Sequence, residues 1–270
     1  MIGKLLTVFL LISTVMITPG EKYYVTFIKG NVLLERTKKQ VKIGDRLNQE
    51  DKLVFGDKTA KVSCISPGKG RFDISAQTLK PDAQGELLAV LRSTLVPAAG
   101  TYHLSTRSLS DQNDDPENYF KIGDNDHFLI LENEMIPIDP KYLIGGVNFF
   151  FVQYTVNGKT ILKKVSSQGN SITFNKNLFI DEKGKALDPD KYVNTLLCFQ
   201  ESVNGSSKSK IIAKFTPVVV SKEELLAEIS VLKTNLINLK NVPAVKNEIY
   251  AHLTANYGTV NISLFESLVN

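Results

Sequence analysis

The three histidines and the two cysteines are the side chains with the most potential for catalysis or metal binding. His103, His127 and His252 are single and widely spaced, and each stands beside apolar neighbours, while Cys64 and Cys198 lie in apolar, strand-like runs. A structural zinc site needs four ligands, and a hydrolase needs a nucleophile within hydrogen-bond reach of its base. The spacing therefore predicts no metal site and no cofactor.

His127 has the best case for a catalytic role. Asp124 and Asp126 stand beside it, and a carboxylate could orient its ring. However, no G-x-S-x-G nucleophile signature occurs in the chain. We predict that the protein is not an enzyme, with a hydrolase of unrecognised type as an alternative.

Two other segments resemble binding loops but lack the required spacing. A phosphate loop has four residues between its two glycines and a Ser or Thr directly after its Lys. Gly68-Lys69-Gly70 has neither feature, so we predict a turn between two strands. Residues 108–117 are rich in Asp but lack the calcium-loop frame. They are expected to form a solvated loop.

The N-terminus has the pattern of an export signal. Lys4 is the only charge in residues 1–20, and the apolar run of residues 5–17 is shorter than the roughly 20 residues that a spanning helix needs. We expect cleavage near Glu21, with a retained membrane anchor as the alternative because Thr18-Pro19-Gly20 is not an A-x-A site. The mature protein is then periplasmic or secreted, with no transmembrane segment.

The overall charge argues against a nucleic-acid partner. The chain has 270 residues with 32 basic and 28 acidic side chains, a net charge of +4. Nucleic-acid binding favours a clustered basic face rich in Arg, whereas these basic residues are nearly all Lys and are spread along the chain.

The chain is expected to be mainly β, with a helical C-terminus. Short β runs broken by Gly, Asp and Lys fill residues 23–76, a short helix is expected at 85–95 and a closing strand at 101–106. This gives a signal peptide at 1–20, a first β domain at 21–107, an acidic linker at 108–119, a β-sandwich-like domain at 120–220 and helices at 221–270. Cys64 and Cys198 then fall in different domains, so we expect no disulfide between them.

A hairpin is the clearest element of the second domain. Asn157-Gly158 supplies the positive φ angles of a type I′ turn. The turn fixes the register and places Val152, Tyr154 and Val156 on one apolar face. Phe149 and Phe151 share the other face with Gln153, Thr155 and Lys164, which suits a partly covered side. An immunoglobulin-like sandwich is expected, with its topology open.

The C-terminal region is expected to form a helical hairpin. Ser221 and Glu224 make a capping box that opens a helix to about residue 240. Pro243 suits the first turn of a second helix, Gly258 is placed to end it, and a third helix is expected at 263–268. The first helix carries one apolar stripe, which we expect to pack within the monomer or to bind a partner. It consists of Leu225, Ile229, Leu232, Leu236 and Leu239.

Residues 23–76 have a recurring order of glycines and short strands. A Gly precedes a β run, a Gly-Asp follows a short strand, a further strand comes next, and a Gly precedes the one after it. The residues that carry this pattern are Gly30, Gly44, Asp45, Leu53, Ala60 and Gly70. In this pattern the segment resembles the FecR-type β domain of bacterial envelope proteins. The resemblance implies a noncatalytic β module used for protein contact. FecR-type proteins also have a cytoplasmic segment before the membrane, which this chain lacks room for, so signalling by that route is not expected.

Together these features predict a noncatalytic exported envelope protein that acts as a protein-binding or scaffold module, with an envelope or secreted protein as its partner. A binder of glycan or peptidoglycan is an alternative. No Trp is present to stack on a sugar ring, although Phe149 and Phe151 could substitute.

Overall fold

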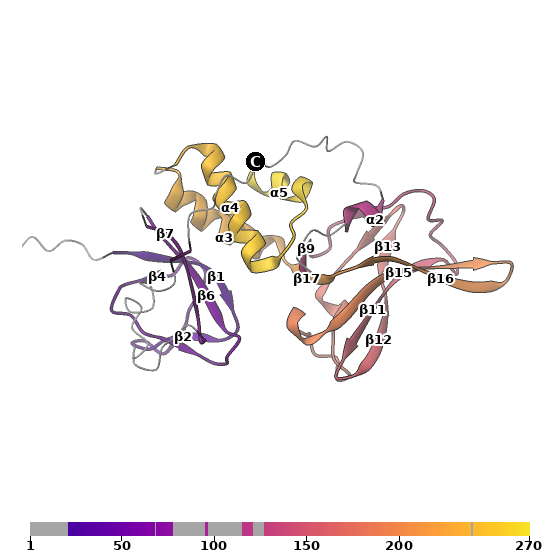
Figure 1. Ribbon diagram of the computed structural model, residues 1–270, viewed down its shortest axis with the longest axis horizontal. Helices are drawn as coiled ribbons and strands as arrows, with labels where there is room; N and C mark the ends of the chain where they lie inside the picture. The colour runs from indigo at the N-terminus through magenta and orange to yellow at the C-terminus, as the bar shows by residue number, and fades with distance from the viewer. Residues whose placement is uncertain (1–20, 68, 78–94, 97–114, 121–126, 239) are drawn as a thin grey trace, which may run out of the picture.

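The computed structural model describes residues 21–67, 69–77, 95–96, 115–120, 127–238 and 240–270. The predicted export signal, the segments 85–94 and 101–106, His103, Leu239 and most of the acidic linker lie outside these residues. The described chain is mainly β with helices at its C-terminus, as the sequence predicts. Figure 1 shows two β units side by side, with the helices packed above the junction between them.

The first β unit is built from two sheets around one apolar core. The sheets have the orders β4-β1-β6-β7-β8 and β3-β2-β5. Their facing sides bury Val25, Val62 and Phe72 from the larger sheet and Val32 and Leu53 from the smaller one. The strands are β1 (Tyr23–Lys29), β2 (Val32–Leu34), β3 (Lys39–Gln40), β4 (Arg46–Leu47), β5 (Leu53–Phe55), β6 (Lys61–Ser66), β7 (Gly70–Ser75) and β8 (Leu95–Val96). Leu95, expected at the end of a helix, instead begins β8.

The second β unit contains a four-stranded sheet, β12-β11-β15-β16, and a three-stranded sheet, β10-β14-β13. Val152 and Tyr154 from the larger sheet and Ile136 and Ile172 from the smaller one share a single core. The strands of the two sheets are β10 (Ile136–Pro137), β11 (Phe149–Val156), β12 (Lys159–Lys164), β13 (Ser166–Gln168), β14 (Ser171–Thr173), β15 (Val193–Val203) and β16 (Ser206–Lys214). Two layers around one core are compatible with the predicted β-sandwich.

A parallel pair of strands was not expected from the sequence. β9 (His127–Leu131) pairs in parallel with β17 (Thr216–Val220), from Thr216 opposite His127 to Val220 opposite Leu131. Pairs of this kind need a long crossover, which the rest of the unit supplies. Short helical turns complete the unit: α2 (Pro116–Tyr119), η3 (Lys176–Leu178) and η4 (Pro189–Lys191). The helix α2 lies inside the segment that was predicted to be a plain linker.

The predicted hairpin is confirmed in turn and in register. Asn157 and Gly158 have φ angles of 49° and 78°. Val156 pairs with Lys159 and Tyr154 with Ile161. Side chains on β11 alternate between buried and half-buried, so one face of the strand lies on the core.

Local signals also set the ends of the helices. The Ser221 capping box is present before α3 (Lys222–Leu236), which ends a few residues earlier than predicted. Asn241 caps α4 (Val242–Tyr257), and Gly258 follows its last residue with a φ of 87°. The third helix is α5 (Ile262–Val269). No helix in the described ranges has the length and apolar character needed to cross a bilayer.

The apolar stripe of α3 is buried inside the molecule. Leu225, Ile229, Leu232 and Leu236 are at most 3% exposed. They share a core with α4 and α5, with strands β9 and β17, and with Phe27 and Ile65 of the first β unit. The four residues are therefore not a partner-binding surface in this fold. The sequence also gave no indication that the helices would pack against the first β unit as well as the second.

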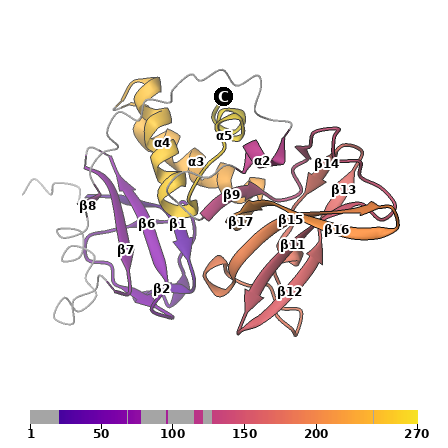
Figure 2. The same ribbon diagram turned by 45° about the vertical axis from the view of Figure 1, so that its right-hand side comes forward.

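The turn between α4 and α5 ties the helices to the second β unit. The Leu129 amide donates to the Thr259 carbonyl over 2.9 Å, and the Thr259 amide donates to the His127 carbonyl over 2.8 Å. Through these bonds Thr259 forms an isolated parallel β-bridge with Phe128 of β9, next to the pair formed by β9 and β17. Figure 2 shows α3, α4 and α5 above both β units. The helices thus join the two units through apolar packing on one side and backbone pairing on the other.

Candidate functional site

The outer face of the four-stranded sheet is the first candidate site. Alternate residues of β11 place Phe150 and Val152 on the core and Phe149, Phe151 and Gln153 on the opposite side. Cross-strand pairing then assigns the neighbours: Phe151 lies opposite Lys164 and Cys198, and Cys198 lies opposite Ile211. Within the described residues the sheet ends at β12 and β16, and the outward side chains Phe149, Phe151, Leu162 and Ile211 belong to none of the buried core clusters.

Several large apolar side chains on this face meet solvent. Their exposed fractions are 60% for Leu162, 61% for Ile211 and 53% for Val193. Isolated exposed apolar residues are ordinary, but a group of them on one sheet face indicates a contact surface. We call this set, together with Phe149, Phe151 and Lys164, the open face.

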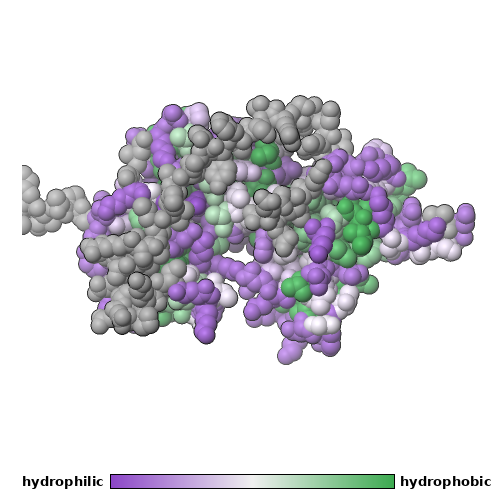
Figure 3. Space-filling view, viewed as in Figure 1, coloured by the Kyte–Doolittle hydropathy of each residue, from purple (hydrophilic) through white to green (hydrophobic). Residues whose placement is uncertain are grey.

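The described charges on the open face all have the same sign. Lys164 and Lys214 are both exposed, and no described Asp or Glu projects from this side of the four strands. The Lys164 ammonium lies 4.7 Å from the centre of the Phe149 ring, a cation–π geometry that holds it over the aromatic pair. Figure 3 shows exposed apolar groups as separate small patches among hydrophilic side chains in one view of the molecule.

The second candidate is a cleft where the two β units and the helices meet. Its volume is about 520 Å³, within the usual range for small-molecule sites. Its walls come from the end of β1, from η3, η4 and β17, and from the facing sides of α3 and α4. The lining is polar and carries both signs of charge, so no single class of ligand is favoured.

An ion pair crosses this cleft between the two β units. The Lys29 ammonium from β1 contacts the Asp190 carboxylate from η4, and His127 Nε2 lies 3.7 Å from the other Asp190 oxygen. Each of the three side chains keeps at least 33% of its surface exposed. The carboxylate partner that was expected for His127 is therefore a distant residue, and the neighbouring Asp124 and Asp126 lie outside the described residues. Among the residues that the structure describes, no Ser or Cys lines the cleft.

A buried polar cluster lies beside the cleft. His252 Nε2 on α4 is 3.0 Å from Glu228 Oε2 on α3, and the Tyr257 hydroxyl donates to the other Glu228 oxygen. All three side chains are buried. Burial, followed by the nearby Glu228 charge, raises the pKa of Tyr257 well above its ordinary value. The phenol therefore stays protonated and acts as a hydrogen-bond donor.

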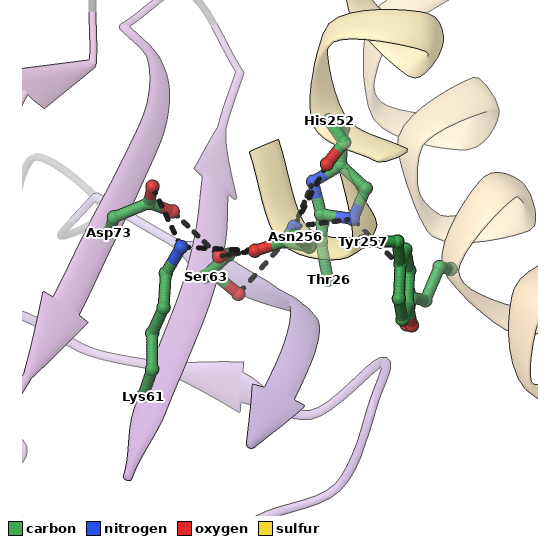
Figure 4. Close-up of polar contacts among 8 residues, drawn as sticks. Thr26, Lys61, Ser63, Asp73, His252, Asn256 and Tyr257 are labelled. Atoms are coloured by element: carbon green, nitrogen blue, oxygen red, sulfur yellow. Dashed lines mark hydrogen bonds and ion pairs between the residues drawn. The ribbon is translucent and has the colours of Figure 1, made fainter. Parts of the chain in front are cut away.

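Asn256 connects this cluster to the first β unit (Figure 4). Its amide nitrogen lies 3.3 Å from His252 Nδ1, and its amide oxygen accepts from the Lys61 ammonium over 3.0 Å. Ser63 donates to Asp73 over 2.6 Å and contacts Asn256 at 3.4 Å. The contacts form a chain from α3 through α4 to β6 and β7.

The Asp73 carboxylate at the far end of this chain is ionised. Burial alone would raise its pKa, but the Lys61 ammonium and the Ser63 hydroxyl outweigh that effect and hold the pKa below its usual value. Ser63 donates to this carboxylate rather than to a histidine, and it is fully buried. The arrangement satisfies buried polar groups across a domain junction and does not activate a nucleophile.

Both cysteines are free and buried, as predicted, and they lie in different β units. Burial raises the pKa of both thiols. No group of three or more His, Cys, Asp or Glu side chains in the described ranges is arranged to hold a metal ion. Comparisons with protein-family models, curated proteins and solved structures found no match for the chain.

The buried cluster could have been anticipated from helical spacing. Glu228 stands three residues after Leu225 and four before Leu232, so it falls on the apolar stripe of α3. His252 follows Ile249 by three residues and therefore falls on the apolar side of α4. An acid and a histidine on the facing sides of two packed helices would predict a buried pair. We predicted His252 to be an isolated side chain, and its buried contact with Glu228 corrects that prediction.

Proposed function

We propose that this protein is a noncatalytic binding module of the bacterial envelope, exported and folded outside the cytoplasm, and that a partner protein docks on the open face. The observation that carries the proposal is the group of exposed apolar side chains on one side of the four-stranded sheet, Leu162, Ile211 and Val193. The FecR-like pattern of residues 23–76 supports it, because such modules serve protein contact.

The energetics favour a protein partner for this face. Burying apolar surface contributes roughly 25 cal/mol per Å², and a specific protein interface buries about 800 Å² on each side. An open sheet with several apolar residues offers this kind of broad, shallow surface. The aromatic pair Phe149 and Phe151 would lie near its centre, and aromatic residues are enriched in binding hot spots.

The test is a pair of charge substitutions on the open face. Leu162→Asp and Ile211→Asp place carboxylates on the two outer strands of the open face, β12 and β16. Val54→Asp is the control: it alters an exposed strand residue of the first β unit, which is 43% accessible. Because all three sites are exposed, the free energy of unfolding should change by less than about 0.5 kcal/mol in each variant.

The expected result is loss of a co-purifying envelope protein from the two open-face variants and its retention by Val54→Asp. Chemical crosslinking in intact cells, followed by mass spectrometry, would identify the partner and the contacting residues. Retention of the same partner by Leu162→Asp and Ile211→Asp would contradict the proposal. Binding of purified peptidoglycan fragments that depends on Phe149 would favour the glycan-binding alternative.

A further inference from the structure

A small cavity lies where α2 and α5 meet the start of β10, and none of its described lining residues belongs to the open face. Its volume is about 150 Å³, the size of a cavity that can hold a molecule of benzene. Met135 and Pro137 form part of its wall and are exposed, so the cavity reaches the surface. It has room for a ligand group of about six non-hydrogen atoms, such as the end of a side chain.

The lining of this cavity favours a positively charged ligand. Its one charged group is the Glu134 carboxylate, and no Lys, Arg or His lies in the lining among the described residues. Ser267 donates to the Leu264 carbonyl over 2.7 Å, which leaves its hydroxyl oxygen able to accept. Tyr119 adds an aromatic ring, and aromatic rings also attract cations. The cavity therefore differs from the larger cleft, whose lining carries both signs of charge.

The Glu134 carboxylate lacks a close counter-charge within the described residues. Glu134 is half-buried, and one of its oxygens is buried with no hydrogen-bond partner there. Burial raises the pKa of this carboxyl group, and the attraction of Lys222 on α3 does not outweigh that effect. Lys222 is also not part of the cavity lining. A partly buried carboxylate without a partner is unfavourable, and a cation that enters the cavity would supply the missing partner.

We infer that this cavity binds a primary ammonium group on a short alkyl chain, either the end of a lysine side chain or a small free amine. The ammonium group donates to the Glu134 carboxylate and to the Ser267 oxygen. Its alkyl chain lies along Met135 and Pro137 at the opening, as the stems of lysine side chains lie on apolar surfaces. This inference goes beyond the proposed function and does not rest on it, because the cavity and the open face share no described residue.

The experiment is an NMR titration of the purified, isotope-labelled protein. The probes are n-butylammonium chloride, its neutral analogue n-butanol, and Nα-acetyl-lysine methylamide as a model of a lysine side chain. Each titration gives a dissociation constant, and shifts of the Met135 methyl group and of the Ser263 and Ser267 amides locate the contact. Glu134→Gln is the test variant, since it removes the charge and keeps the shape. Glu132→Gln is the matched control, because Glu132 does not line the cavity.

We expect n-butylammonium to bind in the millimolar range and n-butanol not to bind. Glu134→Gln should weaken ammonium binding by roughly tenfold or more, whereas Glu132→Gln should leave it unchanged. Binding should weaken as salt increases. It should also weaken as the pH falls, because protons and the ammonium group compete for the same carboxylate. The other described titratable groups beside Glu134 are Tyr119 on α2, whose raised pKa keeps it protonated, and Lys222 on α3.

Several results would overturn the inference. They are equal binding of n-butanol, unchanged affinity in Glu134→Gln, an equal loss in Glu132→Gln, shifts that lie away from Met135, or displacement of the amine by equimolar magnesium or calcium chloride. Absence of binding by both amines at concentrations far above millimolar would do the same.

The two amine probes separate the sources of the ammonium group. Tighter binding of the lysine model than of n-butylammonium would identify a lysine side chain as the ligand, and binding of n-butylammonium alone would identify a small free amine. Either result supports the site. Leu162→Asp on the open face should bind n-butylammonium as the native protein does, so failure of this site and failure of the proposed function are distinguishable.

Discussion

Glu228 on α3 and His252 on α4 form a buried contact, with 3.0 Å between Oε2 and Nε2, at the point where both helices meet the first β unit. The Tyr257 hydroxyl donates to the same carboxylate. Asn256 then leads from His252 to Lys61 and Ser63. The helices are therefore held to each other, and to the first sheet, by one connected set of polar contacts inside an apolar interface.

Glu228→Leu should destabilise the protein strongly. It removes the acceptor of both His252 and Tyr257 and leaves two buried polar groups unpaired, which costs about 3 kcal/mol or more. Glu228→Gln should cost less, because an amide retains hydrogen-bonding capacity. Urea denaturation measures the free energy of unfolding of both variants.

The control is Glu266→Leu, which removes a partly exposed ion pair with Lys246 and should cost less than about 1 kcal/mol. If Glu228→Leu and Glu266→Leu lowered the free energy of unfolding by the same amount, the buried contact would contribute no more to stability than the partly exposed ion pair.

Gly258→Ala should weaken the attachment of the helices to β9. Gly258 has a φ of 87°, and an added Cβ would lie 2.7 Å from the His127 carbonyl carbon, closer than real Cβ contacts. Gly205→Ala is the matched control, since Gly205 also has a positive φ but has no atom within 4 Å of an added Cβ. We expect the Gly205 variant to lose about 1 kcal/mol and the Gly258 variant clearly more. Thermal unfolding of the two proteins would settle the order, and the reverse order would contradict the close packing of the turn on β9.

Glu134→Gln should stabilise the protein near neutral pH. One carboxylate oxygen of Glu134 is buried with no hydrogen-bond partner among the described residues, and burial raises the pKa of this group above its ordinary value. In this situation the folded state binds its proton more tightly than the unfolded state does. The stability of the native protein therefore falls as the pH rises through the interval between the unfolded pKa of about 4.3 and the higher folded pKa.

Denaturation at a series of pH values would test this. The difference between Glu134→Gln and the native protein should be small below the unfolded pKa and should grow as the pH rises above it. Glu132→Gln is a useful comparison, because Glu132 accepts a hydrogen bond from the Lys176 amide. It should not show the same gain. A constant difference across the pH range for Glu134→Gln would mean that its ionisation is not linked to folding.

The elements predicted correctly are those encoded by adjacent residues. Asn157-Gly158 fixes a turn and hence the register of a hairpin, and Ser221 with Glu224 fixes the start of a helix. Alternation along β11 also indicated one buried and one partly covered face. These features need no knowledge of the distant chain, because their geometry follows from local backbone conformation and side-chain spacing.

The features that were missed depend on residues far apart in sequence. The stripe of α3 is covered partly by Phe27 and Ile65, which lie in the first β unit. Nothing near Leu225 or Leu232 indicates that partner. The parallel pairing of β9 with β17, and the contact of His127 with Asp190, likewise join distant segments. Periodicity identifies an apolar face, but it does not determine which surface covers that face.

The burial of the α3 stripe leads to the last prediction. Leu232 is 1% exposed at the centre of the helix, and Leu226 on the same helix is 40% exposed. Leu232→Ala removes apolar contacts and leaves a cavity, so it should cost about 2 to 5 kcal/mol of unfolding free energy. Leu226→Ala should change it by less than about 0.5 kcal/mol. The two substitutions are chemically identical and differ only in burial.

Size-exclusion chromatography of the same variants separates the two interpretations of the stripe. If Leu232 packs within the monomer, Leu232→Ala lowers the urea midpoint and leaves the elution volume unchanged. If the stripe instead binds a partner, Leu232→Ala dissociates a larger assembly while the unfolding free energy stays close to that of Leu226→Ala. Since Leu232 lies in one core with Ile229, Leu236 and the facing side of α4, we expect the first result.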